Sequence, residues 1–182
     1  KANVPIVVLL INSFNLSCFS MNIRLTCLEE LPLLMEMYEK ARTFMQATGN
    51  AHQWINGYPS EEFIRQEIED GHSYVCVDDQ GTLLGTFCFI VGEDPTYARI
   101  YEGAWLNDEP YGVVHRLATN GIQKGISDAC LDWAFRQIGN IRVDTHQDNQ
   151  VMQHILEKHG FQRCGIIIVK NGTERIAFQK TI

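Results

Sequence analysis

Apolar residues recur along this chain with two different periods, and those periods predict its secondary structure. Alternation of apolar and polar positions is typical of a strand with one buried face. Strands are predicted at residues 22–27, 73–78, 82–91, 97–105, 111–118, 140–145, 161–169 and 173–179. Two of the connections, Asp79-Gln80-Gly81 and Asn171-Gly172, are typical hairpin turns, so the strands that flank each of them are expected to pair.

Apolar residues three and four positions apart predict the helices. The pattern is clearest at residues 126–138, where Ile126, Cys130 and Trp133 fall on one helical face. Similar stripes predict helices at residues 31–49, 60–71 and 151–159, and Ser60 is expected to cap the second of these. The predicted order is β-α-α-β-β-β-β-α-β-α-β-β, which is a mixed α/β (α+β) arrangement.

Length and composition are compatible with one domain. At 182 residues and 45% apolar content, the chain can bury a sizeable core, and we expect that domain to span residues 21–182. Residues 1–20 are expected to be an N-terminal extension or leader. Met21 resembles a native start, and the apolar run at residues 5–11 lacks the basic region of a secretion signal beyond Lys1.

Charge and cysteine usage exclude several classes of partner. The net charge is −7, and Lys and Arg form no run or stripe, so we expect no nucleic-acid partner. No apolar run reaches the roughly 18 residues of a membrane span, so we expect no membrane partner either. The six cysteines are scattered without a CxxC motif, which predicts reduced core residues of a cytoplasmic protein.

No metal site is expected. Asp144, His146 and Asp148 are two residues apart from one another at the end of a predicted strand. This spacing offers no fourth ligand, so it is a weak metal signal.

The junction between the strand at 111–118 and the helix at 126–138 has the features of an anion site. The first amides of a helix have no partner within the helix and lie at the positive end of its dipole. Gly125 leaves the backbone open to a ligand, Lys124 adds a charge and Ser127 adds a hydroxyl. We therefore expect a phosphate or pyrophosphate to bind here.

The segment from Asn149 to Phe161 indicates which phosphate-containing ligand binds at this junction. Asn149 precedes a predicted amphipathic helix that ends in Glu157-Lys158-His159-Gly160-Phe161. Together with Lys124-Gly125-Ile126, this segment resembles the GCN5-related N-acetyltransferase (GNAT) superfamily, and the resemblance extends from about Met21 to the C-terminus. It implies the GNAT fold, a central mixed, mostly antiparallel sheet flanked by helices. It also implies that the two central strands splay apart to admit acetyl-coenzyme A (acetyl-CoA).

The resemblance implies a cofactor-binding set. The backbone of Leu117, Ala118 and Thr119 would pair with the pantetheine amides, and the Leu117 N–H would donate to the thioester oxygen. The pyrophosphate would be held by Gln123, Lys124, Gly125, Ile126 and Ser127. Asn149 would contact the pantetheine arm, although its position also suits a helix N-cap.

The sequence departs from the family pattern at three positions. Ile122 replaces an arginine or glutamine of the pyrophosphate loop, and Ser127 replaces a later glycine or alanine. Leu156 replaces the tyrosine that usually protonates the departing thiolate. Water, Tyr111, Tyr101 or a histidine is a candidate substitute for this acid.

The acceptor side has its own candidates. His115 is the first candidate for the general base, because an unperturbed imidazole titrates near neutrality. A structural role for that histidine is the alternative, and Tyr111, Asp144 and His146 are the next candidates for the base. Trp54 and Tyr58 are expected to form a substrate wall or, alternatively, to cover the core, and Asp144 is a further candidate for substrate binding.

The resemblance implies an N-acetyltransferase. It would transfer the acetyl group of acetyl-CoA to the amine of a small molecule, an amino-acid-like compound or a peptide terminus, by direct attack. Two alternatives are a non-catalytic acyl-CoA-binding sensor or regulatory module, motivated by Leu156, and a nucleotide-binding domain. A homodimer is the usual assembly in the resembling family.

Overall fold

The computed structural model describes residues 21–182, so the predicted extension at residues 1–20 lies outside the described part. The described residues form one seven-stranded sheet in the order β1-β2-β3-β4-β5-β7-β6. The strands are β1 Asn22–Leu25, β2 Ser73–Val77, β3 Leu83–Val91, β4 Gly112–Thr119, β5 Asn140–Thr145, β6 Gln162–Ile168 and β7 Glu174–Thr181. All neighbours are antiparallel except β4 and β5, which are parallel.

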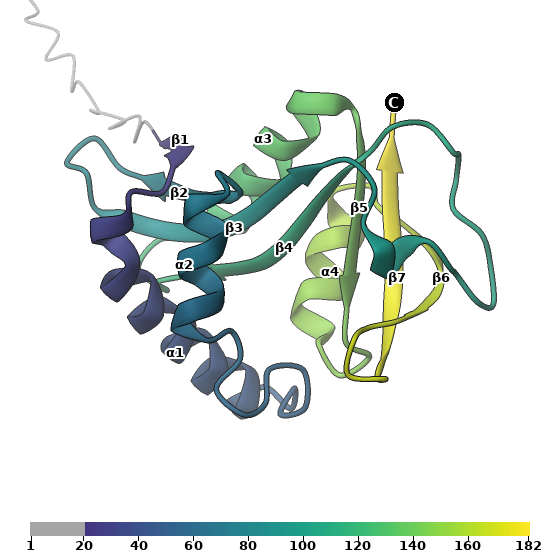
Figure 1. Cartoon of the computed structure of the whole chain (residues 1–182), viewed down its shortest axis with the longest axis horizontal. Helices are drawn as coiled ribbons and strands as arrows, with labels where there is room; N and C mark the ends of the chain where they lie inside the picture. The colour runs from purple at the N-terminus through teal and green to yellow at the C-terminus, as the bar shows by residue number, and fades with distance from the viewer. Residues whose placement is uncertain (1–20) are drawn as a thin grey trace, which may run out of the picture.

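The helices cover both faces of this sheet (Figure 1). They are α1 Leu31–Ala47, α2 Glu61–Glu69, α3 Ile126–Ile138 and α4 Gln150–Lys158, with short 3₁₀ helices at Leu28–Glu30 and Pro95–Tyr97. Val75 and Val77 of β2 pack in one cluster with α1 and α2, whereas Cys76 packs in another with α3 and α4. Successive strand side chains point to opposite faces, so these two clusters lie on opposite sides of the sheet.

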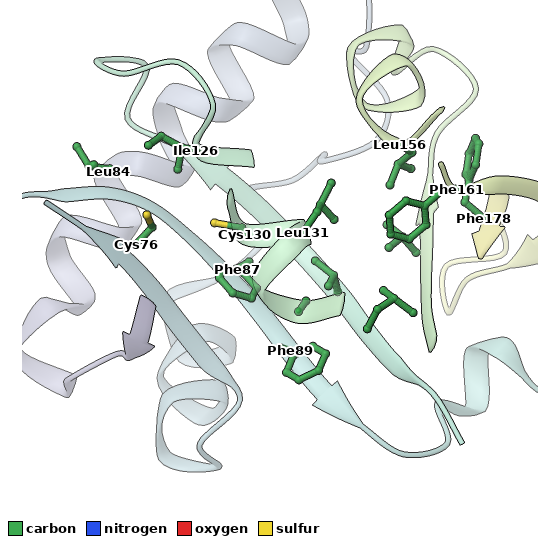
Figure 2. Packing of buried hydrophobic residues seen from close by; sticks show 14 of the residues in the cluster. Cys76, Leu84, Phe87, Phe89, Ile126, Cys130, Leu131, Leu156, Phe161 and Phe178 are labelled. Atoms are coloured by element: carbon green, nitrogen blue, oxygen red, sulfur yellow. The ribbon is translucent and has the colours of Figure 1, made fainter. Parts of the chain in front are cut away.

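The larger cluster joins α3 and α4 to the middle of the sheet (Figure 2). Phe87 and Phe89 of β3 contribute rings to it, and Cys130 and Leu131 face it from α3. Among the described cysteines, Cys76, Cys88, Cys130 and Cys164 are free and buried, and Cys27 is free and exposed. The predicted core role therefore holds for four of them.

The predicted helices and seven of the predicted strands are confirmed. The predicted cap of α2 is also present, because Ser60 Oγ accepts a hydrogen bond from the Phe63 amide at 3.2 Å. No helix within residues 21–182 is long and apolar enough to cross a membrane.

The strand predicted at residues 97–105 is wrong. Tyr97 ends a 3₁₀ helix, and Tyr101 pairs with Ile166 of the edge strand β6 as an isolated bridge only. Glu102 then takes a positive φ of 54°, and the Trp105 indole donates back to the Tyr97 carbonyl at 3.0 Å. Because the chain folds back here, it cannot form the continuous strand pairing that the alternating pattern predicts.

β4 departs from regular pairing on both of its edges. Toward β5, only Gly112 and Val113 are paired, so the two strands meet at one end and diverge toward the other (Figure 1). Toward β3, the register shifts between His115 and Ala118, and Arg116 there has a φ of 54°. This irregularity is a β-bulge, which inserts one extra residue and re-aims the side chains around it. The predicted splay of the central strands is confirmed.

The cluster between α3 and the sheet should dominate stability. Leu131 is 1% exposed, so Leu131→Ala should lower the free energy of unfolding by about 2–5 kcal/mol, through lost burial and the cavity left behind. Leu33→Ala is the matched control, because Leu33 is 50% exposed and should change stability by less than about 0.5 kcal/mol. Urea denaturation of both variants measures the difference, and equal costs would contradict this packing.

Candidate active site

A cavity of about 1340 Å³ lies where β4 and β5 diverge. The end of α1, residues 53–60 and α2 line one part of it, and β5, the start of α4 and the β6–β7 hairpin line another. Residues 114–119 of β4 also line it. Segments far apart in sequence thus converge on one concave space, which is typical of a ligand site.

The cavity brings together most of the predicted site residues. Those that line it are Trp54, Tyr58, His115, Leu117, Ala118, Thr119, Ser127, Asp144 and Asn149. Tyr111, Gln123, Lys124, Gly125 and Ile126 do not line it. The last four belong to the turn that leads from β4 into α3.

This turn is open at its glycines. Gly121 and Gly125 have φ values of 78° and 81°, and a Cβ at either position would meet no atom within 4 Å. Gly125 is the N-cap of α3, so the amides of the first helical turn are available to an anion. The Ile126 side chain is buried in the core, so only the backbone of this residue is available to a ligand.

The arrangement fits an extended ligand that carries a phosphate group. Beyond Val113, the β5-facing edge of β4 has no strand partner within the described residues, so backbone amides and carbonyls remain for a ligand with its own amides. The open glycine turn follows directly after this edge. Both features match the chemistry of acetyl-CoA, whose pantetheine arm has two amides and is joined to a pyrophosphate.

His115 is the central titratable side chain of the cavity. It belongs to β4, is 18% exposed, and its Nε2 lies 2.9 Å from Asp94 Oδ2. Asp94 Oδ1 also accepts a hydrogen bond from the Thr96 amide at 2.8 Å. Burial acts to raise the pKa of the Asp94 carboxyl, but these two bonds outweigh it and lower that pKa to about 2. The carboxylate therefore stabilises the fold above its ordinary pKa of 3.8, and this contribution is lost as the pH falls toward 2.

The bond to Asp94 determines the tautomer of His115. A carboxylate only accepts, so in the neutral imidazole Nε2 carries the proton and Nδ1 keeps the lone pair. Nδ1 lies 3.9 Å from Oδ1 of Asp144 on β5. A basic nitrogen and a carboxylate oxygen therefore lie on either side of a short gap between the two diverging strands.

Asp144 is held by residues on two other elements. The Tyr97 hydroxyl donates to its Oδ1 at 2.7 Å, and Arg175 Nε lies 4.0 Å from its Oδ2. Burial, followed by the charge of Asp144, raises the pKa of Tyr97 well above its ordinary value, so this hydroxyl stays protonated and acts as a donor. Asp144 is thus fixed in place beside His115.

The structure does not place the two tyrosine candidates for the missing acid in the cavity. Tyr111 is buried, its hydroxyl accepts a hydrogen bond from the Asp94 amide at 3.2 Å, and the Arg142 guanidinium lies 3.8 Å from its ring centroid. Tyr101 is exposed in the loop that bridges to β6. Leu156 is fully buried in the core, and its hydrocarbon side chain has no proton to donate to a thiolate.

Aromatic rings form the wall of the cavity between α1 and α2. The rings of Trp54 and Tyr58 are 6.3 Å apart, and those of Tyr58 and Phe63 are 6.0 Å apart. Trp54 also contacts the buried Tyr38 at 5.7 Å, so it covers the core and lines the cavity at once. Both roles proposed for this residue from the sequence are therefore compatible with its position.

A buried ion pair at the β4 bulge was not predicted from the sequence. Arg116 Nη2 lies 3.2 Å from Glu67 Oε2, and the two side chains are 9% and 12% exposed. The Arg116 guanidinium also donates to the Tyr58 hydroxyl at 3.2 Å and lies 4.7 Å from the Phe63 ring centroid. Burial alone would lower the pKa of Arg116, but Cys88, Tyr58 and Glu67 raise it overall, so it remains charged.

Asp94 was also missed. The run Asp94-Pro95-Thr96 is a recognisable cap for a short helix, and Asp94 does cap the 3₁₀ helix. Its partner His115 is 21 residues further along the chain. Nothing in the local pattern indicates that contact, which depends on how the loop after β3 folds against β4.

Asp144, His146 and Asp148 are engaged in contacts other than metal ligation. His146 Nδ1 accepts a hydrogen bond from the Asp148 amide at 3.1 Å, whereas Asp144 is bonded to Tyr97. Within residues 21–182, no three His, Cys, Asp or Glu side chains are grouped as metal ligands.

Comparison with known proteins establishes the class to which this fold and cavity belong. The sequence profile of the acetyltransferase (GNAT) family matches residues 34–161. The chain therefore belongs to the GNAT acetyltransferase family and is an acyltransferase. No curated protein matches the chain in sequence.

Solved structures agree with this assignment. A GNAT-family acetyltransferase from Streptococcus agalactiae is 34% identical with a TM-score of 0.81, over 90% of this chain and 97% of that one. One from Listeria monocytogenes is 19% identical with a TM-score of 0.67, over 89% and 95%. An aminoglycoside acetyltransferase in complex with coenzyme A and kanamycin is 18% identical with a TM-score of 0.61, over 89% and 95%. At their lower identity, the last two structures show that this chain shares their fold.

Removal of the carboxylate at Glu67 should destabilise the fold. Glu67→Ala leaves the buried Arg116 guanidinium without its charged partner, which should cost about 1–3 kcal/mol. Glu61→Ala is the matched control, because its ion pair with Arg65 on the same helix is exposed and should contribute less than about 1 kcal/mol. Thermal and urea denaturation compare the two variants. An unchanged Glu67→Ala protein would show that Arg116 does not depend on this pair.

Proposed function

We propose that residues 21–182 act as one N-acetyltransferase domain, which transfers the acetyl group of acetyl-CoA to a primary amine by direct attack. The observation that carries the proposal is the pairing of His115 with Asp94 beside Asp144, in a cavity that opens between β4 and β5. Family membership supports the acetyltransferase chemistry. The choice of a primary amine as acceptor rests on these three side chains.

The coenzyme would supply the acetyl thioester. In this proposal, its pyrophosphate binds the turn at residues 123–127 and its pantetheine arm pairs with residues 117–119 along the free edge of β4. The Leu117 N–H donates to the thioester oxygen, whose negative charge increases during attack. Asn149 flanks the same arm at the start of α4.

Deprotonation of the amine is assigned to His115. Asp144 Oδ1 and His115 Nδ1 are 3.9 Å apart, so an amine nitrogen beside both atoms can donate one proton to Asp144 and direct another toward His115. Asp94 then stabilises the imidazolium that forms, as a second carboxylate at the opposite ring nitrogen. In this scheme Asp144 orients the amine and His115 accepts its proton, which returns through water to the departing thiolate.

The body of the acceptor would lie against Trp54 and Tyr58. Arg116 and Arg175 also line the cavity, but each has a carboxylate partner, Glu67 and Asp144 respectively. Neither guanidinium therefore presents an uncompensated positive charge to the acceptor. These features favour a small molecule or peptide terminus whose reacting group is the amine itself.

Loss of the imidazole should impair chemistry more than binding. His115→Gln should reduce kcat by about 10²–10⁴-fold, the usual contribution of a general base, and should leave the Kd for coenzyme A within about twofold. His154→Gln on the exposed side of α4 is the matched control and should keep wild-type activity. Steady-state kinetics with an amine panel provides the measurement. Full activity of His115→Gln would refute the assigned role.

Asp94 should act through the imidazole. Asp94→Asn replaces the carboxylate that accepts from Nε2 with an amide that can donate to it, so the proton of the neutral ring can move to Nδ1, the nitrogen that faces the amine. We expect kcat to fall at least tenfold and the Kd for coenzyme A to stay within about twofold. Steady-state kinetics and calorimetry measure the two quantities, and an unchanged kcat would indicate that Asp94 is only structural.

Coenzyme binding can be tested at the glycine turn. Gly125→Asp places a carboxylate where the pyrophosphate is expected, so calorimetric titration should find coenzyme A binding weakened at least tenfold. Gly81→Asp is the matched control, because Gly81 has the same φ of 81° and the same open surroundings in the β2–β3 hairpin. An equal loss in both variants would indicate backbone strain. Wild-type protein without coenzyme A affinity would refute the proposed function.

A further inference from the structure

Gln53 lies at the boundary between the two halves of the cavity. It precedes Trp54 in the loop between α1 and α2, and it lines the cavity together with Asn149 at the start of α4. Its backbone carbonyl accepts a long hydrogen bond of 3.5 Å from Arg175 Nη2. Neither its sequence position nor the reaction scheme above gives this glutamine a role.

Asn149 determines which way the Gln53 amide faces. Asn149 Oδ1 accepts a hydrogen bond from the Met152 amide at 3.0 Å, because it caps α4. Its Nδ2 group therefore faces Gln53, at 2.9 Å from Gln53 Oε1. A donor requires an acceptor opposite it, so Gln53 must present its oxygen to Asn149.

Two further donors reinforce this orientation. Asn50 Nδ2 lies 2.8 Å from Gln53 Oε1, and the Thr145 hydroxyl lies 3.5 Å from the same atom. An amide oxygen has two lone pairs, so these contacts together with Asn149 use its full accepting capacity. A rotation of the Gln53 amide by 180° would place NH₂ against NH₂ at the Asn149 contact, where the α4 cap fixes the partner amide.

The other end of the amide is consequently a fixed donor. No hydrogen bond from Gln53 Nε2 to any group within residues 21–182 is present, although the other atom of this amide accepts from three partners. Nε2 is also absent from the buried polar atoms without partners in that part of the chain, so it is accessible. An oriented and accessible N–H pair on a cavity wall is suited to a carbonyl oxygen.

We propose that Gln53 Nε2 is a ligand-binding donor that recognises a carbonyl oxygen in this cavity. The inference rests on the proposed function. Two sources of such an oxygen adjoin Gln53: an amide of the pantetheine arm on the Asn149 side, and a carbonyl next to the reacting amine of the acceptor on the Trp54 side. The second source would make the acceptor an amino-acid amide or a peptide terminus.

Gln53→Glu isolates the donor with little change of shape. A glutamate oxygen still accepts from Asn149, Asn50 and Thr145, whereas the second oxygen repels a ligand carbonyl. The control is Gln66→Glu, which adds the same charge on α2 outside the cavity. Asn149→Asp is the complementary variant. It keeps the α4 cap but requires a donor from Gln53, so the Gln53 amide should rotate and lose its ligand.

Two measurements distinguish the sources of the carbonyl. The first is the Kd for coenzyme A by calorimetry, and the second is the ratio of kcat/KM for phenylalaninamide to that for phenethylamine, which lacks the carboxamide. A pantetheine carbonyl predicts that Gln53→Glu raises the Kd about tenfold or more and leaves the ratio unchanged. An acceptor carbonyl predicts an unchanged Kd and a ratio that falls about tenfold or more toward one.

For an acceptor carbonyl, Asn149→Asp should reproduce the fall in the kcat/KM ratio, provided that thermal unfolding confirms a folded protein. Only the ratio is compared for this variant, because Asn149 itself lies beside the proposed pantetheine arm and can change the Kd for coenzyme A directly. Unchanged Kd and unchanged ratio in Gln53→Glu would overturn the inference, as would an equal change in Gln66→Glu. The proposed function fails separately, if wild-type protein binds coenzyme A but acetylates no amine of the panel. In that case the calorimetric arm still tests Gln53 directly.

Discussion

The divergence of β4 and β5 is the constraint on which the rest of this structure depends. They are the one parallel pair in the sheet, and only two residues of β4 are paired across it. A sheet normally satisfies its own backbone groups, so an interrupted ladder near its centre leaves donors and acceptors for something else. Core packing by α3 and α4 on one face, and by α1 and α2 on the other, keeps the sheet intact around this gap. The cavity is therefore a consequence of sheet topology, and the side chains that line it determine which ligand it can bind.

Three ion pairs line this cavity. His115 faces Asp94, Arg175 approaches Asp144, and Arg116 faces Glu67, each in a half-buried or buried setting. Buried charges without partners are costly, so this pairing is what permits ionisable groups at the site at all. The pairing also orients these groups. Each one is bonded to its partner on one side, so only its other side faces the cavity. The imidazole of His115, bonded at Nε2 and open at Nδ1, is the clearest example.

Sequence analysis was most successful where structure is local. The helix stripes, the Ser60 cap and both hairpin turns depend on neighbouring residues, and the structure contains all of them. The strand prediction from Tyr97 to Trp105 was wrong although apolar and polar residues do alternate there. The bonds that fold this segment back connect it to β6 and connect Trp105 to Tyr97, and the alternation does not indicate them. At the site, Asp94, Glu67 and Gln53 were missed for a related reason. The partners that define their roles are His115 for Asp94, Arg116 for Glu67 and Asn149 for Gln53. These partners lie between 21 and 96 residues away, so no spacing rule connects them.

The bulge at Arg116 has an effect on how β4 can vary. His115 is opposite Cys88 and Ala118 is opposite Thr86, so residues three apart on β4 share a face. The strand thus consists of two halves in opposite phase, joined at one irregular residue. Deletion of the extra residue at this joint would restore regular alternation, and both halves would keep their present faces and partners on β3. Such a deletion would instead remove the irregular edge that Arg116 contributes to the cavity. The pairing of β4 with β3 therefore does not require the bulge, whereas the shape of the cavity wall does.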